Sequence, residues 1–484
     1  MVDPPATAGG TDRIQVQTSN KNSLLMLLHV EDRIEKLDCS IIADTTLGPA
    51  LFEQLRAAQR ELGLLQGDRA TCPFLRPHIL PRRQYETIKR AAETLAGTFE
   101  KVAVAALTDQ SLLAFHGLTR DEEEAARIEP GYSRLCVSSR LDGYVNAKGF
   151  QFLEYNAETP AGVGDQMQLE KILFRLPALK HFLETNSHWL PQPHVALLTS
   201  LLKAYREWGG EEEKPRIAII DWEGVPTGGE FRTLKDYFVS QGYPAVIADP
   251  HHLEYNGDVL SVDGLRIDIV YKRVVIHEFL SKFGLDHPLV WAYRKGRVCM
   301  ANSFRTKLAH KKSIFAVLSD PFYGYLFDTD EREVIQKHIP WTRYVRPSRI
   351  VFHGSELDLE TLILNEREQF VLKPNDDYGG HGVLLGWETN KQEWQSAVKA
   401  ALQRPYVVQE RVVLEKTNMP AYSDRVYLDE LFVDFNPFLF QNEVEGALIR
   451  LSASSLLNVT SGGGQTALLV LEDDAHEIPS DAGA

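Results

Sequence analysis

One segment constrains the fold of this chain more than any other. Residues 140–156 read RLDGYVNAKGFQFLEYN. Polar and apolar residues alternate on both sides of Asn146-Ala147-Lys148-Gly149, which predicts two antiparallel strands joined by a tight turn. Gly149 suits the left-handed position of a three-residue hairpin loop. Counting from this loop gives three cross-strand pairs: Asn146 with Phe150, Asp142 with Glu154, and Arg140 with Asn156.

Strand side chains alternate between the two faces of a sheet, so four polar residues should share one face: Arg140, Asp142, Glu154 and Asn156. Opposed carboxylates at about 5 Å repel each other. A bound Mg²⁺, held by carboxylate and amide oxygens, would remove this conflict. Arg140 can offer a planar guanidinium to a phosphoryl group beside the metal. Alternating polar residues are also common on solvated sheet faces, so the hairpin alone leaves both interpretations open.

A second informative segment covers residues 370–383, FVLKPNDDYGGHGV. We expect a strand that delivers Lys373 and ends at Pro374, followed by a glycine-rich turn. Glycines let backbone N–H groups approach phosphate oxygens, and lysine supplies positive charge. The GK[ST] sequence of a Walker A loop is missing. The candidate nucleotide contacts are Lys373, Tyr378, Gly379, Gly380 and Gly382, and the alternative is a glycine hairpin with a surface lysine.

Two later segments carry further candidates. Residues 406–412, YVVQERV, predict a strand whose apolar run is broken by Gln409 and Glu410. Such a strand can line an adenine pocket, although a plain core or edge strand is the alternative. Downstream, Arg450 on a predicted strand is followed by Asn458 and a run of three glycines. This arrangement could close over a triphosphate, or it could be a hairpin with a surface arginine.

Residues 216–275 have a different character. A buried strand (217–221), a helix (230–241) and a second strand (245–248) alternate, which predicts a small α/β unit with parallel strands. The sequence lacks GxGxxG, so we predict no dinucleotide site in this unit. Lys272 and Arg273 follow a further predicted strand and are weak candidates for binding an anionic substrate, with a surface charge pair as the alternative.

Composition excludes several classes of protein. The chain has 484 residues, which favours two or three lobes over one simple core. Lysine and arginine number 52 against 67 acidic residues, a net charge of −15. This balance argues against nonspecific binding to nucleic acid or to an anionic membrane. The four cysteines are far apart, which favours neither zinc nor disulfides and fits a reducing cytoplasm.

The order of these motifs resembles the circularly permuted ATP-grasp group, whose best-known enzyme is glutathionylspermidine synthetase. In the ordinary ATP-grasp order the acidic-x-Asn element comes last, whereas here Glu154-Tyr155-Asn156 precedes Lys373 by most of the chain. The resemblance implies a mixed α/β (α+β) protein with a circularly permuted ATP-grasp fold and an inserted Rossmann-like pre-ATP-grasp domain.

The resemblance also implies residue roles. Arg140 would contact the transferring phosphoryl group or the substrate carboxylate, and Asp142, Glu154 and Asn156 would bind Mg²⁺. Lys312, in HKKSIFAVL, resembles the first nucleotide-binding lysine of the group, and Lys373 resembles the second. The region from Arg450 through Asn458 is similar to that of uncharacterised members. The remaining nucleotide-site candidates are Tyr378, Gly379, Gly380, Gly382, Gln409 and Glu410.

With this resemblance the chain is predicted to divide into five regions. They are a disordered leader (1–20), N-terminal helices with the metal-binding hairpin (21–210), a Rossmann-like domain (211–300), nucleotide-binding lobes (301–472) and a disordered acidic tail (473–484).

The function implied is an ATP- and Mg²⁺-dependent ligase that joins a carboxylate to an amine through an acyl phosphate. The partners would be a small-molecule or peptide carboxylate and an amine, with neither nucleic acid nor membrane. Three alternatives stay open: a non-catalytic ATP-binding protein of the same fold, an ATP-dependent phosphotransferase, and an interaction protein that binds no nucleotide. Residues outside the nucleotide site do not match a glutathione or polyamine pocket, so those substrates are not carried over.

Overall fold

The computed structural model describes residues 30–146, 149–455 and 463–473. Four expectations fall wholly or partly outside these ranges. They concern the leader (1–20), Ala147 and Lys148 of the hairpin turn, Asn458, and residues 474–484 of the acidic tail.

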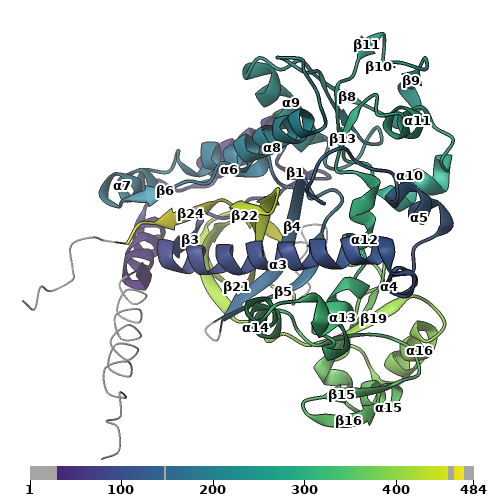
Figure 1. Ribbon diagram of the computed structural model, residues 1–484. Helices are drawn as coiled ribbons and strands as arrows, with labels where there is room; N and C mark the ends of the chain where they lie inside the picture. The colour runs from purple at the N-terminus through teal and green to yellow at the C-terminus, as the bar shows by residue number, and fades with distance from the viewer. Residues whose placement is uncertain (1–29, 147–148, 456–462, 474–484) are drawn as a thin grey trace, which may run out of the picture.

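A six-stranded sheet forms the centre of the molecule (Figure 1). Its order is β23-β22-β21-β4-β5, with β20 paired to β21, and the pairings are antiparallel. The strands are β4 (Ser138–Asn146), β5 (Gly149–Asn156), β20 (Lys416–Tyr422), β21 (Val426–Phe440), β22 (Glu443–Ser452) and β23 (Gly464–Thr466). The early hairpin and the late strands therefore share one sheet, because β21 pairs directly with β4.

The hairpin register confirms two of the three predicted pairs. Asp142 lies opposite Glu154, and Arg140 lies opposite Asn156. The third predicted pair, Asn146 with Phe150, is wrong, because Asn146 pairs with Gly149. The turn is therefore one residue shorter than the three-residue loop we expected.

A β-bulge restores the register. Gly143 pairs with Phe152 while Asp142 pairs with Glu154, so Leu153 is the extra residue on β5. A Cβ atom on Gly143 would lie 2.6 Å from the carbonyl oxygen of Gln151, so this position requires glycine. The shorter turn and the extra strand residue cancel, and the predicted polar face is preserved.

Helix α3 (Arg82–Thr108) packs along the central sheet and, with 27 residues, is the longest of the described helices (Figure 1). Its buried stripe includes Phe99, which is fully buried. The Phe99 ring stacks on Tyr155 of β5 at 4.5 Å and also meets Phe315 of α13 (Ser313–Ser319) at 5.2 Å. One aromatic side chain thus fixes the carboxylate strand relative to the lysine-bearing helix.

The chain beside α3 is largely helical. Residues 30–43 form a helix. The other helices are α2 (Pro49–Glu61), α4 (Gln110–His116), α5 (Arg120–Ala126), α6 (Asp165–Leu173), α7 (Pro177–Thr185) and α8 (Pro193–Glu207). Two small sheets complete this region: β1 (Leu65–Gln66) with β2 (Arg69–Ala70), and β3 (His78–Pro81), β24 (Leu468–Leu471) and β6 (His188–Trp189).

A four-stranded parallel sheet, β13-β12-β7-β8, forms a second unit. Its strands are β7 (Ile217–Ile220), β8 (Ala245–Ala248), β12 (Ile269–Lys272) and β13 (Cys299–Ala301). Its other elements are α9 (Gly228–Ser240), β9 (Leu253–Tyr255), β10 (Leu260–Val262), β11 (Leu265–Arg266), α10 (Ile276–Phe283) and α11 (Pro288–Arg294). The predicted strand–helix–strand alternation is confirmed, whereas the five-region division of the chain stays a prediction.

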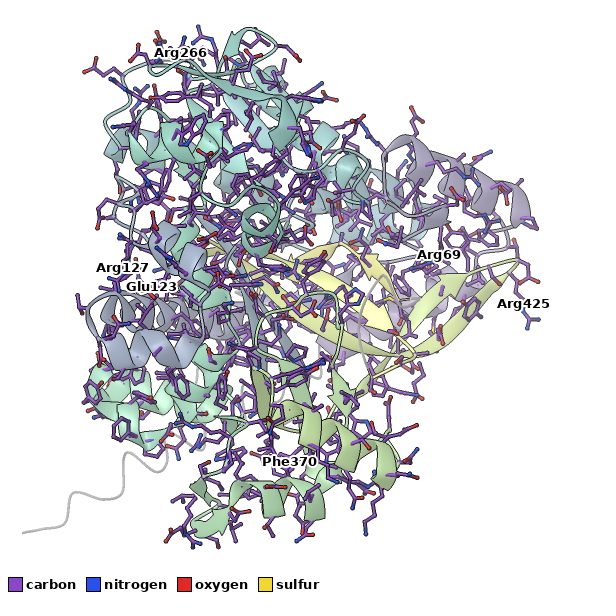
Figure 2. The ribbon with its side chains drawn as sticks, turned by 90° about the vertical axis from the view of Figure 1, so that its right-hand side faces the viewer. Arg69, Glu123, Arg127, Arg266, Phe370 and Arg425 are labelled. Carbon is purple, nitrogen blue, oxygen red and sulfur yellow. The ribbon has the colours of Figure 1, made fainter. Side chains whose placement is uncertain are left out.

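A third unit carries the glycine-rich segment. Its sheet has the order β14-β19-β17-β18 and packs around the fully buried Trp394. Its elements are β14 (Thr342–Tyr344), β15 (Arg349–Phe352), β16 (Ser355–Asp358), α15 (Leu359–Asn365), β17 (Phe370–Pro374), β18 (Leu384–Leu385), α16 (Lys391–Ala401) and β19 (Tyr406–Glu410). The helices α12 (Lys307–His310) and α14 (Thr329–His338) precede this unit in sequence, and their buried residues pack in the core that includes α3. Figure 2 places Arg266 and Phe370 at opposite ends, with Arg425 at the tip of the β20–β21 hairpin. Among the described helices, none is both long and apolar enough to cross a membrane.

Replacing Phe99 with alanine should destabilise the whole molecule. The substitution removes a fully buried ring that joins α3, β5 and α13. We expect the free energy of unfolding in urea to fall by about 3–5 kcal/mol. Val104→Ala on the same helix is the matched control, because Val104 is 53% exposed and should change stability by no more than about 0.5 kcal/mol. Equal effects of the two substitutions would contradict this packing.

Candidate functional site

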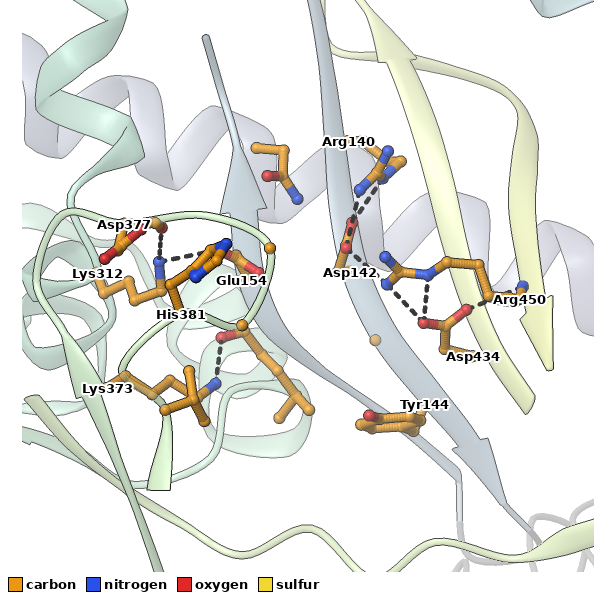
Figure 3. Close-up of a pocket in the computed structure, with 16 residues that line it drawn as sticks. Arg140, Asp142, Tyr144, Glu154, Lys312, Lys373, Asp377, His381, Asp434 and Arg450 are labelled. Atoms are coloured by element: carbon orange, nitrogen blue, oxygen red, sulfur yellow. Dashed lines mark hydrogen bonds and ion pairs between the residues drawn. The ribbon is translucent and has the colours of Figure 1, made fainter. Parts of the chain in front are cut away.

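A cavity of about 150 Å³ lies between the central sheet and the third unit (Figure 3). Nine residues singled out from the sequence line it: Arg140, Asp142, Glu154, Asn156, Lys312, Lys373, Gly379, Gly380 and Arg450. They come from β4, β5, the start of α13, β17 with its following loop, and β22. The fold therefore gathers residues that are up to 310 positions apart in the sequence, 140 to 450.

Two arginines hold Asp142. Arg140 donates from Nε to Oδ1 at 2.7 Å and from Nη2 to Oδ2 at 3.0 Å. Arg450 donates from Nη2 to Oδ2 at 2.9 Å. Burial alone would raise the pKa of Asp142, but the two guanidinium groups lower it below its usual value. The carboxylate is therefore ionised near neutral pH.

Asp434 is a site residue that the sequence reasoning missed. It pairs across the strands with Arg450, whose Nη2 lies 2.6 Å from Oδ2. Asn436 donates a further hydrogen bond to Oδ1 at 2.6 Å. Burial raises the pKa of Asp434, and Arg450 opposes the rise. The available signal was the sequence LFVDFNPFLF, in which Asp434 and Asn436 interrupt an apolar strand on one face.

Glu154 faces Lys312 across the cavity. Lys312 lies at the N-cap of α13, and its Nζ is 2.9 Å from Glu154 Oε1. The same Nζ donates to the carbonyl of Asp377 at 2.6 Å, so the lysine links the hairpin to the glycine-rich loop. Burial acts to raise the pKa of Glu154, but Lys312 lowers it below its usual value. Both hairpin carboxylates are thus held in their charged form.

Lys373 is held in part by the β-bulge described above. Its Nζ donates to the carbonyl of Leu153, the extra residue, at 3.1 Å, and to Gln409 Oε1 at 2.7 Å. Burial lowers the pKa of Lys373 to about 8. Gln409 does not line the cavity and instead positions Lys373, while it donates to Thr342 Oγ1 at 3.1 Å.

The glycine-rich loop is anchored at its base. Asp376 lies 2.7 Å from Lys307 Nζ and 2.6 Å from Lys311 Nζ. Gly379 and Gly380 line the cavity, whereas Gly382 does not. Gly382 has φ +68°, and a Cβ atom there would lie 2.7 Å from Pro374 Cγ, so its role in this structure is to shape the turn.

Other predicted residues lie away from this cavity. Glu410 binds His353 at 2.9 Å on the far end of β19. Tyr378 points to a neighbouring cavity and donates from its hydroxyl to Glu278 at 2.6 Å. Lys272 and Arg273 are not a surface charge pair, because they are only 0% and 3% exposed. Asn458 lies outside the described residues.

A buried charge cluster lies behind the loop. Among the described residues, Glu158, His310 and Asp376 are close enough to hold a metal ion. Lys307 already supplies a cation there, because its Nζ is 2.9 Å from Glu158 and 2.7 Å from Asp376. The cluster is therefore a structural ion network that fixes the loop base rather than a metal centre.

The donors on the sheet face fit a hard divalent cation. Asp142 and Glu154 are ionised, and both line the cavity together with Asn156, which adds an amide oxygen. Oxygen donors of this kind are those that Mg²⁺ prefers. The lysines and arginines that neutralise these carboxylates also face the same cavity, so polyanionic groups can enter without leaving unbalanced charge.

Comparisons with known proteins bear on the fold of the chain. A glutathione synthetase-like effector of Globodera pallida has a solved structure that matches with TM-score 0.55 and 15% identity, covering 87% of this chain and 96% of that one. The fold is ATP-grasp-like. A putative glutamate–cysteine ligase 2 of Frankia casuarinae is 25% identical over 86% of this chain and 50% of its own length.

The remaining comparisons set the limits of this likeness. An uncharacterised protein of Synechocystis sp. is 25% identical over 43% of this chain and 43% of its own length. No family model matches the chain. The chain spans about half the length, or less, of these curated relatives. It is distantly similar to ATP-dependent carboxylate–amine ligases.

Asp434→Asn should show how far the stability of the site depends on the buried ion pairs that Arg450 forms with Asp434 and Asp142. The change leaves Arg450, whose side chain is only 16% exposed, without one of its two carboxylates. We expect the free energy of unfolding in urea to fall by roughly 3 kcal/mol, because breaking a buried pair strands a charge. Glu430→Gln is the matched control on β21, since its partner Lys416 is an exposed neighbour at 3.4 Å. A neutral effect of Asp434→Asn would contradict the structural role.

Proposed function

We propose that this chain is an ATP- and Mg²⁺-dependent ligase that joins a carboxylate to an amine through an acyl phosphate. One observation carries the proposal: two ionised carboxylates and two arginines on the central sheet share a single cavity with Lys312 and Lys373, which come from outside that sheet. A site lined by both acidic and basic side chains suits a polyphosphate with its bound Mg²⁺ better than it suits a free polyphosphate or a free Mg²⁺.

Each side chain has a distinct part in this reaction. Asp142, Glu154 and Asn156 would hold Mg²⁺, which supplies positive charge at the phosphates. Lys312 and Lys373 bind phosphate oxygens in place of the carbonyl oxygens that they contact here. Ammonium groups aimed at these oxygens stabilise the charge that develops as the phosphoryl group moves.

The arginines act beside the metal ligands. Arg140 and Arg450 bracket Asp142, so either guanidinium can turn a free donor towards the transferring phosphoryl group or the substrate carboxylate. An oxygen of the substrate carboxylate attacks the γ-phosphorus of ATP, and ADP leaves. An amine then attacks the resulting acyl phosphate, and phosphate is released. The loop with Gly379 and Gly380 lies over the cavity, where it would exclude water from the acyl phosphate.

The chain order fits the circularly permuted arrangement. The metal-binding hairpin precedes both lysines in sequence, yet it pairs with β21 from the late part of the chain. We therefore propose that regions 21–210 and 301–472 together form the ATP-grasp core, with 211–300 inserted between them as a Rossmann-like domain. The Frankia casuarinae relative is named for glutamate and cysteine, which makes L-glutamate the first carboxylate to test.

Hydroxylamine trapping tests this function. Wild-type protein with Mg-ATP, hydroxylamine and L-glutamate, or another of the common amino acids, should release ADP and form a hydroxamate, since only an acyl phosphate gives that product. Glu154→Gln should lower the rate roughly 10²- to 10³-fold, because it removes one charged group from the site. Colorimetric hydroxamate detection and coupled ADP release give the two readouts.

The control is Glu356→Gln, on an exposed strand of the third unit, which should keep the wild-type rate. A phosphorylated product without hydroxamate would identify a phosphotransferase instead. Calorimetric Mg-ATP binding without turnover of any amino acid would favour a non-catalytic protein. Full turnover by Glu154→Gln would remove the hairpin from the mechanism.

A further inference from the structure

A second, larger cavity of about 470 Å³ adjoins the first. Arg140, Asn156, Gly379, His381 and Arg450 line both cavities. A molecule in the second cavity would therefore lie directly beside the arginines that flank Asp142. The loop after β5, the start of α6 and the second α/β unit form much of the remaining wall, and residues between 63 and 71 contribute to it as well.

The walls of this second cavity are acidic. Five carboxylates line it: Glu158, Asp165, Asp221, Glu230 and Glu278. Of the three arginines among its described lining residues, Arg140 and Arg450 are already bound to Asp142, and Arg273 Nη2 lies 3.9 Å from Glu230. His310 also lines it, but burial lowers the pKa of this imidazole, so it is neutral near pH 7. The excess of negative charge favours a cationic ligand.

Four of these five carboxylates are engaged within the protein. Glu158 binds Lys307 at 2.9 Å, and Glu278 accepts from the hydroxyl of Tyr378 at 2.6 Å. Asp221 accepts from the backbone N–H of Trp222 at 2.8 Å. Glu230 accepts from backbone N–H groups of the loop at 162–164, at 2.8 to 3.5 Å.

Asp165 differs from these four in its placement. It is the first residue of α6 and is partly exposed to the cavity. The loop that precedes it is fixed from two sides: Glu230 accepts its backbone N–H groups, and Arg140 donates to the carbonyl of Ala161 at 2.6 Å. The Asp165 carboxylate is therefore held on a rigid turn next to an arginine of the first cavity.

The surroundings of Asp165 suit proton transfer near neutral pH. Burial raises the pKa of Asp165 to about 7, and the nearby charge of Glu230 adds to the rise. Gln465 and Arg140 oppose it. An ordinary aspartate has a pKa near 3.9 and would be a far weaker base.

Arg273 provides an independent sign of a ligand. This arginine is 3% exposed, and its Nη1 donates to the carbonyl of Pro160. Its Nε is buried and has no hydrogen-bond partner among the described residues. A buried guanidinium N–H without a partner is costly, and a small turn of the Arg273 side chain into the cavity that it lines would let an oxygen of a bound molecule satisfy it.

We propose that the second cavity binds the amine acceptor, with its ammonium group against Asp165, and that Asp165 takes one proton from it before attack. This inference rests on the proposed ligase function. The neutral amine nitrogen then forms a bond to the acyl carbon, and the bond from that carbon to the phosphate oxygen breaks. The departing phosphate takes the second proton from nitrogen, and Asp165 later releases the first to water.

The acceptor class is a primary amine that also carries an oxygen able to accept from Arg273. An α-amino acid satisfies both requirements, because its carboxylate can meet Arg273 while its ammonium group meets the acidic wall. Hydroxylamine is largely neutral at pH 7 and needs neither contact. The two acceptors therefore separate the steps that form the acyl phosphate from the step that consumes it.

Asp165→Asn should change the choice between these acceptors. With Mg-ATP and the amino-acid carboxylate that gives hydroxamate, the common α-amino acids are supplied singly as acceptors at pH 7.5. We expect the ratio of amide to hydroxamate, measured by mass spectrometry, to fall about 10²-fold, since general-base catalysis contributes at least that much. In the wild type, the amide rate should rise with pH through about 7, as Asp165 becomes ionised, and this inflection should vanish in Asp165→Asn.

Asp236→Asn is the matched control, because Asp236 lies on the exposed side of α9 with its side chain 74% exposed. Its amide-to-hydroxamate ratio should equal that of the wild type. An unchanged ratio in Asp165→Asn, or hydroxamate formation by the wild type without amide from any of the amino acids, would overturn the assignment. Absence of hydroxamate in the wild type would instead refute the proposed ligase function.

Discussion

The Arg450 side chain is the interaction on which this site depends. It lies between Asp434 on β21 and Asp142 on β4, at 2.6 and 2.9 Å, and so ties three strands through charge as well as through backbone hydrogen bonds. Those strands come from residues near 140 and from residues beyond 430. Because buried charges must be paired, the early hairpin cannot adopt this environment until the late strands are in place. The site and the central sheet therefore form together.

The sequence predicted the polar face of the hairpin better than its turn. Arg140, Asp142, Glu154 and Asn156 do share one face, but the predicted turn was one residue too long, and the bulge at Leu153 was not foreseen. The two errors cancel because both shift the register by one residue. Local rules govern turn length, whereas the bulge also serves a distant partner: the Leu153 carbonyl accepts from Lys373. Contacts with such distant residues are not encoded in any local pattern.

Contacts between distant parts of the chain also explain why one site residue was missed and why another lies away from the cavity. Asp165 belongs to a segment without a recognisable motif, and only tertiary packing brings it near Arg140. Asp434 instead pairs with Arg450 across the β21–β22 hairpin, so its place follows from the register of two consecutive strands. Gln409 lies on a strand that was correctly predicted, yet its side chain supports Lys373 instead of lining the cavity. Strands and their alternating faces could be read from periodicity. The packing of separate units decides which face of a strand meets which neighbour. The residues that determine this packing are spread over the whole chain.

The two cavities differ in the balance of charged residues that line them. In the first, four lysines and arginines outnumber the two hairpin carboxylates, and Asp377 and Asp434, which also line the cavity, bring the acidic residues to four. In the second, carboxylates prevail, and most of them are held by hydrogen bonds from the protein. Arg140 touches both, since it binds Asp142 on one side and the carbonyl of Ala161 on the other. The same guanidinium therefore fixes a carboxylate of the first cavity and the loop that precedes Asp165 in the second.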